Sequence, residues 1–318
     1  MVEYGRGLIG YILTIISLVH GSITLIVCCT VVIGIAYHYY HYHRRMKRTE
    51  KVTLMLSANI YIFMLIFMVI LIANNAETLI GDMYGVDFSI NRSLCIFKGY
   101  FIVSICCATY SSFVIQAFYR LCRIVYHNYR RVQLYWFYLI VTPIQLTAGF
   151  LLASPVVIWH DIGYIPNDYY CYIQFTNFRA TMWSAFSAYG IPIVCLLMIY
   201  TRITLFIRNH SVRQTNIAIQ RQNRDLAAMQ RIIVNVGILL TLGLPTLILL
   251  FVLLITRFEH PLLHRTMWLD VEVSMAILSV GMIWMTPQLK DIFLGRKLLN
   301  RVIPVGTSFH LQPNITTR

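Results

Sequence analysis

The sequence predicts an all-α membrane protein with seven transmembrane helices in one bundle. Hydrophobic residues make up 58% of the chain and charged residues only 12%, whereas about a quarter of a typical soluble domain is charged. The apolar residues also gather in seven stretches, each near the roughly 20 residues that a helix needs to cross a bilayer. We therefore expect spans at residues 8–34, 52–74, 96–119, 135–159, 181–206, 231–256 and 267–289.

The distribution of charge predicts the orientation of these spans. Twenty of the 26 Lys and Arg residues lie in the gaps after the first, third and fifth spans or in the C-terminal tail, and nine of the 12 Asp and Glu residues lie on the other side. Basic residues are enriched in cytoplasmic loops. The N-terminus is therefore expected outside and the C-terminus in the cytosol. The net charge of +14 indicates contact with anionic lipid headgroups, not with nucleic acid.

The spans account for nearly the whole chain, which reads as a single domain. Residues 1–298 form the predicted seven-transmembrane domain. Residues 299–318 contain Pro304, Gly306 and Pro313 and are expected to form a short disordered cytosolic tail. Residues 207–231 lack Pro and Gly and are rich in Arg, Gln and Ala, so we expect helical extensions around a short turn there.

Two of the eight cysteines face the outside in this topology. Cys95 lies at the outer end of the third span and Cys171 lies between the fourth and fifth spans, whereas the others lie inside spans or at a cytosolic end. Disulfides persist in the oxidising extracellular space. A Cys95–Cys171 disulfide is the natural pairing, and two unpaired thiols are the alternative.

The third span connects an outer cysteine with an inner arginine. Cys95 and Arg120 are 25 residues apart, which is roughly 37 Å of helix. This pattern resembles the rhodopsin-like (class A) G-protein-coupled receptors. The resemblance runs from the first span to about Lys297, and further matching positions are Pro155, Pro192, Tyr200, Pro245 and Pro287. It implies a switch for G-protein coupling at Arg120, Tyr200, Pro192, Pro245 and Pro287.

The residue before the inner arginine departs from the family pattern, because Tyr119 stands where these receptors carry an acid. Asp225 lies twenty residues before Pro245, at the cytosolic end of the sixth span. In similar receptors an acid at that position pairs with the arginine and holds the inner ends of the helices closed. The resemblance therefore implies an Arg120–Asp225 pair, and the alternative is that Asp225 is a solvated charge.

Other departures identify the chain as a divergent member. Gly243 stands two residues before Pro245, where the family usually has Trp, and Pro287 is not followed by the usual Tyr. Ile102 replaces the acid that anchors amine ligands, and Val280 replaces the lysine that attaches retinal. Neither an amine held by that acid nor a retinal Schiff base is therefore expected.

The outer ends of the spans supply the candidate ligand pocket. Acids outnumber basic residues there by nine to six, which favours a short peptide with a positive end. Glu272 is the expected anchor because it lies deeper than Asp270, which cannot share its helix face. An apolar ligand and rim charges without a ligand are the alternatives. The pocket candidates are Lys98, Ile102, Arg179, Trp183 and Glu272.

The predicted function is that of a plasma-membrane receptor that binds an extracellular ligand and activates a heterotrimeric G protein. A seven-helix transporter or channel is the alternative, but it would favour acids in the centres of the spans or a repeat that pairs the two halves. Neither is apparent in the first six spans. No His, Asp and Glu cluster with metal-ligand spacing suggests an enzyme, so no metal or cofactor is expected. Asn91, with Ser93, is a glycosylation site on the outer side.

Overall fold

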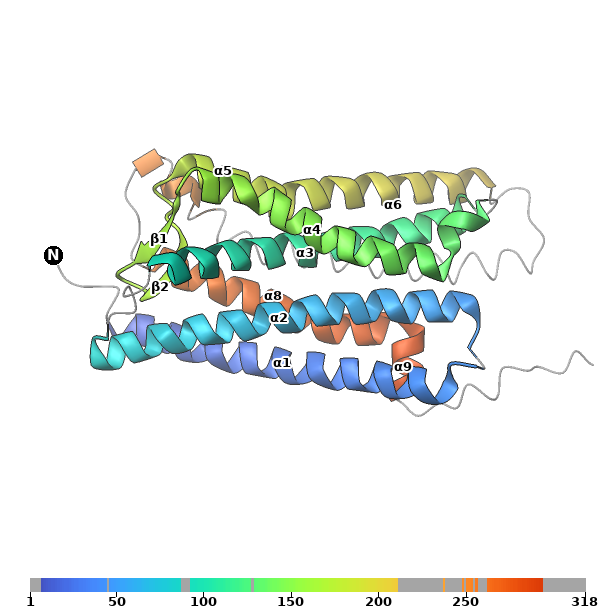
Figure 1. Cartoon of the computed structure of the whole chain (residues 1–318), viewed down its shortest axis with the longest axis horizontal. Coiled ribbons are helices and arrows are strands. Elements are labelled where there is room, and N and C mark those ends of the chain that lie inside the picture. Colours follow the sequence, from blue (N-terminus) through green and yellow to red (C-terminus); the bar gives the residue numbers. More distant parts are fainter. Residues whose placement is uncertain are drawn as a thin grey trace, which may run out of the picture.

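The computed structural model describes residues 7–44, 46–86, 92–126, 129–210, 237, 248, 250–253, 255–256 and 262–293. These residues form an all-α membrane protein, a bundle of long helices that run side by side (Figure 1). The long helices are α1 (Leu8–Tyr42), α2 (Arg48–Tyr84), α3 (Arg92–Ile124), α4 (Tyr135–Ile158), α6 (Ile191–His210) and α8 (Leu263–Met285). Shorter elements are η2 (Arg130–Gln133), α5 (Phe178–Ala185), η3 (Phe186–Gly190) and α9 (Pro287–Phe293).

Six helical segments of the described chain are long and apolar enough to cross a membrane, one of them made of α5, η3 and α6. They coincide with six of the seven predicted spans. The remaining prediction, 231–256, falls mostly outside the described residues, as does the predicted tail at 299–318. The helices continue beyond the apolar stretches because backbone hydrogen bonding carries on into polar flanks. Consequently α2 reaches Tyr84, ten residues beyond the predicted end of the second span.

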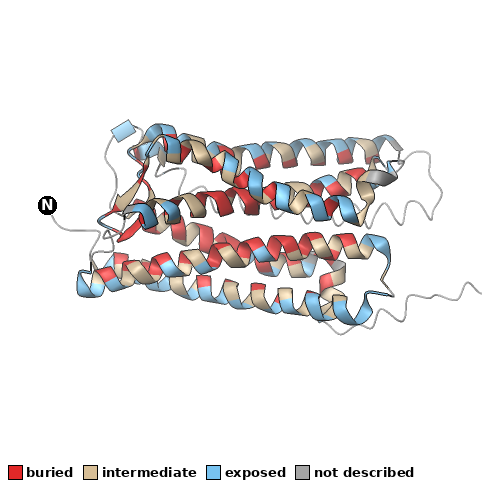
Figure 2. Ribbon diagram, in the orientation of Figure 1, coloured by how far each residue is buried: buried red, intermediate tan, exposed pale blue. Residues whose placement is uncertain are grey.

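Helix α3 occupies the centre of the bundle. It packs against α2, α4 and α6, while α1 packs against α2 and α8. Buried positions accordingly concentrate on α2 and α3 (Figure 2). Gly149 of α4 brings two helices unusually close, because a Cβ there would lie 2.8 Å from the Ser104 carbonyl oxygen of α3. Small residues at such contacts are typical of membrane helices.

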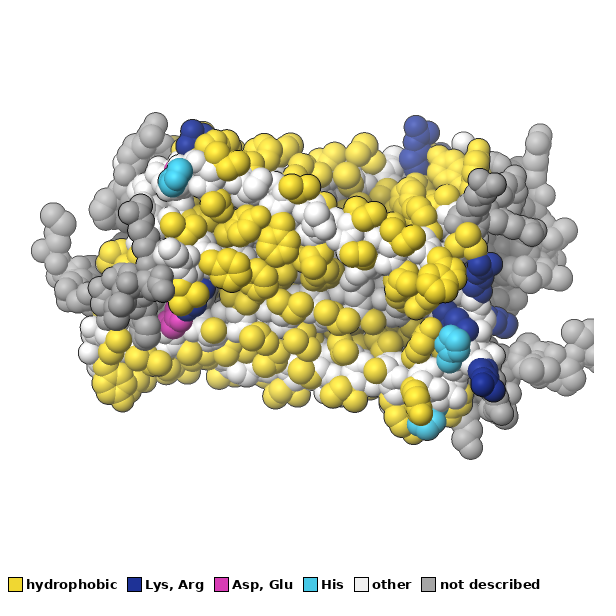
Figure 3. Space-filling view, in the orientation of Figure 1, with side chains coloured by type: hydrophobic (Ala, Val, Ile, Leu, Met, Phe, Trp, Pro, Cys, Tyr) yellow, Lys and Arg dark blue, Asp and Glu magenta, His cyan; other side chains and the backbone are white. Residues whose placement is uncertain are grey.

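The outer surface of the bundle is suited to lipid. Large exposed apolar side chains lie on all the long helices, including Ile26, Trp136, Leu151, Leu197 and Trp284. Figure 3 shows this hydrophobic surface along the length of the bundle, with most of the visible Lys and Arg side chains at one end. We call this end, which carries the α1–α2 connection, the basic end. Exposure of an apolar surface of this extent to water would be unfavourable, and such a surface is typical of contact with a membrane.

The opposite end carries a β-hairpin that the sequence did not predict, and we call it the hairpin end. Strand β1 (Ile162–Ile165) pairs antiparallel with β2 (Tyr170–Ile173), with Tyr164 opposite Cys171. The Cys171 sulfur is bonded to that of Cys95 in the first turn of α3, and their Cα atoms are 5.2 Å apart. The predicted pairing is therefore confirmed. Because Gly99 of α3 has no side chain, the hairpin lies directly on the helix.

Two prolines interrupt the regular helices. Pro192 cannot donate a backbone hydrogen bond, and the turn before it is the π-helix η3, where the Ile191 N–H bonds to the Phe186 carbonyl. Pro287 begins α9, because the preceding Thr286 adopts the extended conformation (φ −95°, ψ 105°) that proline favours in its neighbour. The predicted seventh span therefore ends as a straight helix at Met285. In Figure 1, α9 turns sharply away from α8 and lies beside α1.

Candidate functional site: a cavity along α3

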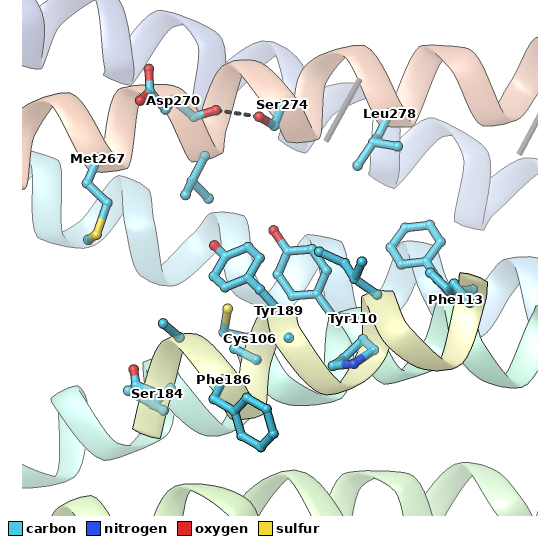
Figure 4. A pocket seen from close by; sticks show the side chains of 18 of the residues that line it. Cys106, Tyr110, Phe113, Ser184, Phe186, Tyr189, Met267, Asp270, Ser274 and Leu278 are labelled. Atoms are coloured by element: carbon cyan, nitrogen blue, oxygen red, sulfur yellow. Dashed lines mark hydrogen bonds between the residues drawn. The ribbon is translucent and has the colours of Figure 1, made fainter. Parts of the chain in front are cut away.

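A cavity of about 410 Å³ lies between α3, the η3–α6 segment and α8, with β2 at one end. Figure 4 shows its central part. This volume falls within the usual range for small-molecule sites. Most of the lining is apolar or aromatic, and it includes Val103, Cys106, Tyr110, Phe113, Tyr172, Phe175, Ala188, Tyr189, Leu196, Met267, Trp268, Val271 and Leu278.

Two tyrosine hydroxyls and a thiol of the lining lie beside the middle of α3. The rings of Tyr110 and Tyr189 lie 4.5 Å apart, centroid to centroid, and both hydroxyls point towards α8 in Figure 4. The Cys106 thiol lies next to them, close enough to hydrogen-bond with Tyr189. Asp270 also borders the cavity, but its carboxylate turns away from the space between the helices. The central cavity therefore offers hydroxyl and thiol groups in apolar surroundings.

The hairpin closes the cavity at its own end. Tyr172 of β2 and Phe175 line it, and Trp268 of α8 donates a hydrogen bond of 2.7 Å from Nε1 to the Tyr170 hydroxyl. The Tyr172 and Trp268 rings pack edge to face at 4.9 Å. Burial raises the pKa of both tyrosine hydroxyls far above the usual range. They therefore remain neutral at any physiological pH.

A buried ionic cluster holds the hairpin to the helices. Arg265 of α8 donates to both carboxylate oxygens of Asp82, at 2.7 and 3.0 Å, and from Nε to Asp168 at 2.9 Å. Its remaining donors reach the Thr14 hydroxyl at 3.4 Å and the Asn167 carbonyl at 3.2 Å. All five N–H groups of the guanidinium thus have acceptors. The cluster joins α1, α2, α8 and the hairpin.

The cluster favours the ionised form of the Asp168 carboxyl, against the effect of burial. Burial raises the pKa of this carboxyl, and the neighbouring His264 and Arg265 oppose that rise. The backbone carbonyl of Asp168 also accepts a hydrogen bond of 2.6 Å from Thr78 of α2. Next to it, the Tyr169 ring lies where a side chain on Gly81 would stand. The turn of the hairpin is therefore fixed to α2 as well as to α8.

Glu272, a predicted pocket residue, does not line the cavity. Its carboxylate accepts hydrogen bonds from Ser17 of α1, at 2.5 Å, and from Asn75 of α2, at 2.7 Å. The expected separation of Glu272 from Asp270 is present, but the faces are reversed, because Asp270 borders the cavity and Glu272 points to α1 and α2. The two positions differ by two residues, or about 200° around the helix.

The other four predicted pocket residues also lie outside the cavity lining. Lys98 forms an ion pair with Glu77 of α2. Ile102 is fully buried in the hydrophobic core and is not part of the lining. Arg179 is exposed and stacks on the Trp159 ring, 4.4 Å from its centroid. Trp183 donates a hydrogen bond of 2.8 Å to the Leu152 carbonyl of α4, so its ring serves the α4–α5 contact.

Among the predicted switch residues in the described chain, Arg120, Tyr200 and Pro287 lie towards the basic end, whereas Pro192 lies near the middle of the Phe178–Asn209 segment. Arg120 and Pro192 line the cavity. Tyr200 is buried against Ala117 and Ile203, near enough to Arg120 to interact with its charge. Pro287 starts α9, next to Thr286 of the lining. Asp225, Pro245 and Asn91 lie outside the described residues.

Comparison with known proteins does not identify the chain: no family model matches it, and no curated protein matches it. Among the described residues, no group of three or more His, Cys, Asp or Glu side chains lies close enough together to hold a metal ion.

Two groups of residues in this region were not predicted from the sequence. The first is the aromatic and thiol lining of α3 and η3, which reads as ordinary core. The second group is the pair of residues that hydrogen-bond to Glu272. A pattern in the sequence could have indicated their helix contact, because Thr14, Ser17, Gly21 and Thr24 recur every three or four residues and form a small-residue face on α1. Such a face indicates close helix packing in a membrane.

Proposed function

We propose that the protein is a divergent rhodopsin-like G-protein-coupled receptor with seven spans, the seventh being residues 231–256. It resides in the plasma membrane with its N-terminus outside and its C-terminus in the cytosol. The disulfide at the hairpin end supports this orientation, since disulfides persist outside the cell. The Lys and Arg residues at the basic end support it too, because they face the anionic inner leaflet.

The observation that carries the proposal is the length of the cavity along α3. It extends from Val103, close to the hairpin, to Arg120 at the basic end, which is about 25 Å of helix. The ligand site and the surface that would meet the G protein therefore share the walls of one cavity. A ligand that binds one arrangement of α3, α6 and α8 more tightly would shift the population towards it.

The lining favours an apolar ligand over a cationic peptide. With Glu272 facing α1 and α2, the expected acidic anchor for a peptide amine is absent from the described cavity wall. The ligand that fits best is a small, uncharged, largely apolar molecule. One carbonyl, ether or hydroxyl group on it would hydrogen-bond with Tyr110 or Tyr189, and the rest would contact Met267, Val271 and Leu278.

A cavity-filling variant tests the proposal. Cells that express the receptor with a promiscuous G protein are screened with a library of uncharged apolar compounds. Ala188 is buried and lines the cavity, so Ala188→Phe should lower the potency of any agonist by about tenfold or more, a loss of ~1.4 kcal/mol.

The matched control is Val194→Phe, which places the same phenylalanine side chain at a half-exposed position on α6 outside the lining. Its agonist potency should remain that of the parent at equal surface expression. Equal potency for both variants would show that the agonist does not occupy this cavity.

A further inference from the structure

A buried carboxyl group joins three helices at a place separate from the cavity. Glu272 of α8 has 0% of its surface exposed. Ser17 donates to one carboxylate oxygen at 2.5 Å, and Asn75 donates to the other at 2.7 Å. The second N–H of the Asn75 amide reaches the Ser17 hydroxyl at 3.1 Å. Both partners of Glu272 are uncharged.

The carboxyl group lies tightly against α1. A Cβ added to Gly21 would stand 3.5 Å from the Glu272 carboxyl carbon and 3.1 Å from Ile72 of α2. Glycine at this position thus lets α1 approach the carboxyl closely. The site therefore has little room for the water shell that an ionised carboxylate requires.

The charged groups of α8 and α2 near this site bond to partners other than Glu272. Arg265, two turns away on α8, uses all five donors on Asp82, Asp168, Thr14 and Asn167. The positive charge of Arg265 is therefore paired with Asp82 and Asp168, not with Glu272.

The remaining titratable groups of these helices also point elsewhere. Glu77 of α2 is paired with Lys98. His264 of α8 stacks on Phe175 at 4.2 Å, and Asp270 borders the cavity on the other side of the helix. On α1, the Nδ1 atom of His20 lies 2.9 Å from the carbonyl oxygen of Ile16 in its own helix. No cation within the described chain contacts the Glu272 carboxyl.

We propose that the Glu272 carboxyl group is a proton-binding site. It is protonated, and therefore neutral, while α1, α2 and α8 are packed together. An ionised carboxylate without a cation in apolar surroundings is costly, and the group takes up a proton from solvent instead. The Glu272 carboxyl group and the Ser17 hydroxyl form a short hydrogen bond of 2.5 Å. Loss of the proton would leave a charge between the three helices.

The proton is therefore linked to the packing of α1 on α8. As the pH rises, ionisation of Glu272 favours separation of the helices and entry of water. The opposite side of α8 carries Met267, Val271 and Ser274 of the cavity lining, so this change alters the wall of the cavity. The inference does not depend on the receptor function, because it concerns only the packing of the bundle.

The test compares the pH dependence of thermal unfolding in purified protein. Wild-type protein should lose thermal stability as the pH is raised from mildly acidic to mildly alkaline. Glu272→Gln keeps the shape of the neutral acid and should remove most of this slope. Glu77→Gln is the matched control, because its carboxylate already has Lys98 as a partner, and it should retain the wild-type slope. A Glu272→Gln variant with the full wild-type slope would overturn the proposal.

Infrared spectroscopy provides a test that needs no variant to fold. Protein with carbon-13 in the carboxyl groups of glutamate should show, at neutral pH, the C=O stretch of a protonated acid. That band should carry the isotope shift of labelled glutamate. A spectrum with only ionised glutamate carboxylates at neutral pH would show that Glu272 does not hold a proton.

Discussion

Arg265 of α8 and Asp82 of α2 form a two-point ion pair, with nitrogen–oxygen distances of 2.7 and 3.0 Å. Both side chains are more than nine-tenths buried, and Asp168 of the hairpin approaches the same guanidinium. The pair therefore connects the start of the last long helix, the end of α2 and the hairpin that closes the cavity. Planar, bidentate geometry of this kind is specific to arginine.

Replacement of Arg265 should destabilise the protein strongly. Arg265→Met leaves two carboxylates buried without a cation, which costs on the order of 3–5 kcal/mol. Thermal unfolding of purified protein measures the loss. Arg179→Met is the control, because Arg179 is exposed and its pairing with Asp161 is worth at most about 1 kcal/mol. Equal losses for the two variants would mean that the buried cluster contributes no special stability.

Loss of the disulfide should reduce the amount of folded protein that reaches the cell surface. Cys95 and Cys171 are 76 residues apart, and closing such a loop destabilises the unfolded state by about 4–5 kcal/mol in the loop-entropy model. Cys95→Ser and Cys171→Ser should lower surface expression to the same degree, and the double variant should be no worse. Additive losses would indicate that the two thiols act independently.

Removal of Asp225 should raise ligand-independent signalling. If Asp225 pairs with Arg120 in the inactive state, the exposed pair is worth roughly 0.2–1 kcal/mol, so basal activity should rise by at most about fivefold. Basal G-protein activation of Asp225→Ala at matched surface expression measures this. Asp291→Ala, an acid of α9 at the same end, should leave it unchanged. An unaltered basal level in Asp225→Ala would identify Asp225 as a solvated charge.

The glycosylation sites report the orientation. The chain has sequons at Asn91 with Ser93, which is predicted outside, and at Asn209 with Ser211 and Asn314 with Thr316, which the topology places in the cytosol. Glycan analysis of protein from intact cells should therefore find no glycan on Asn209 or Asn314, while Asn91 is open to modification. A glycan on Asn209 or Asn314 would contradict the proposed topology.

The long helices could be predicted from the sequence because apolar length alone determines them. Stretches such as 52–74 and 96–119 are too apolar for any other environment, and they coincide with α2 and α3. Topology likewise left Cys95 and Cys171 as the outward-facing pair. The hairpin was missed because β1 and β2 have only four residues each. Strands this short obtain their pairing from the disulfide and from contact with α3, which a local pattern cannot reveal.

The direction of side chains around the last long helix could not be predicted. Helical spacing separates Asp270 from Glu272, but it does not tell which face meets the cavity. That choice follows from tertiary contacts, since Ser17 and Asn75, which hydrogen-bond to Glu272, lie 255 and 197 residues away from it in sequence. The prediction favoured Glu272 because it lies deeper in the span. Depth along a helix carries no information about the helix face.

The central claim is that the protein is a receptor whose cavity ligand activates a G protein. The most direct measurement is nucleotide exchange on purified heterotrimeric G proteins mixed with the purified protein in lipid nanodiscs. An apolar agonist from the cell screen should accelerate exchange, and Ala188→Phe should abolish that acceleration while Val194→Phe retains it. Exchange that stays at the receptor-free rate with every G-protein class, although the agonist binds the protein, would contradict the account.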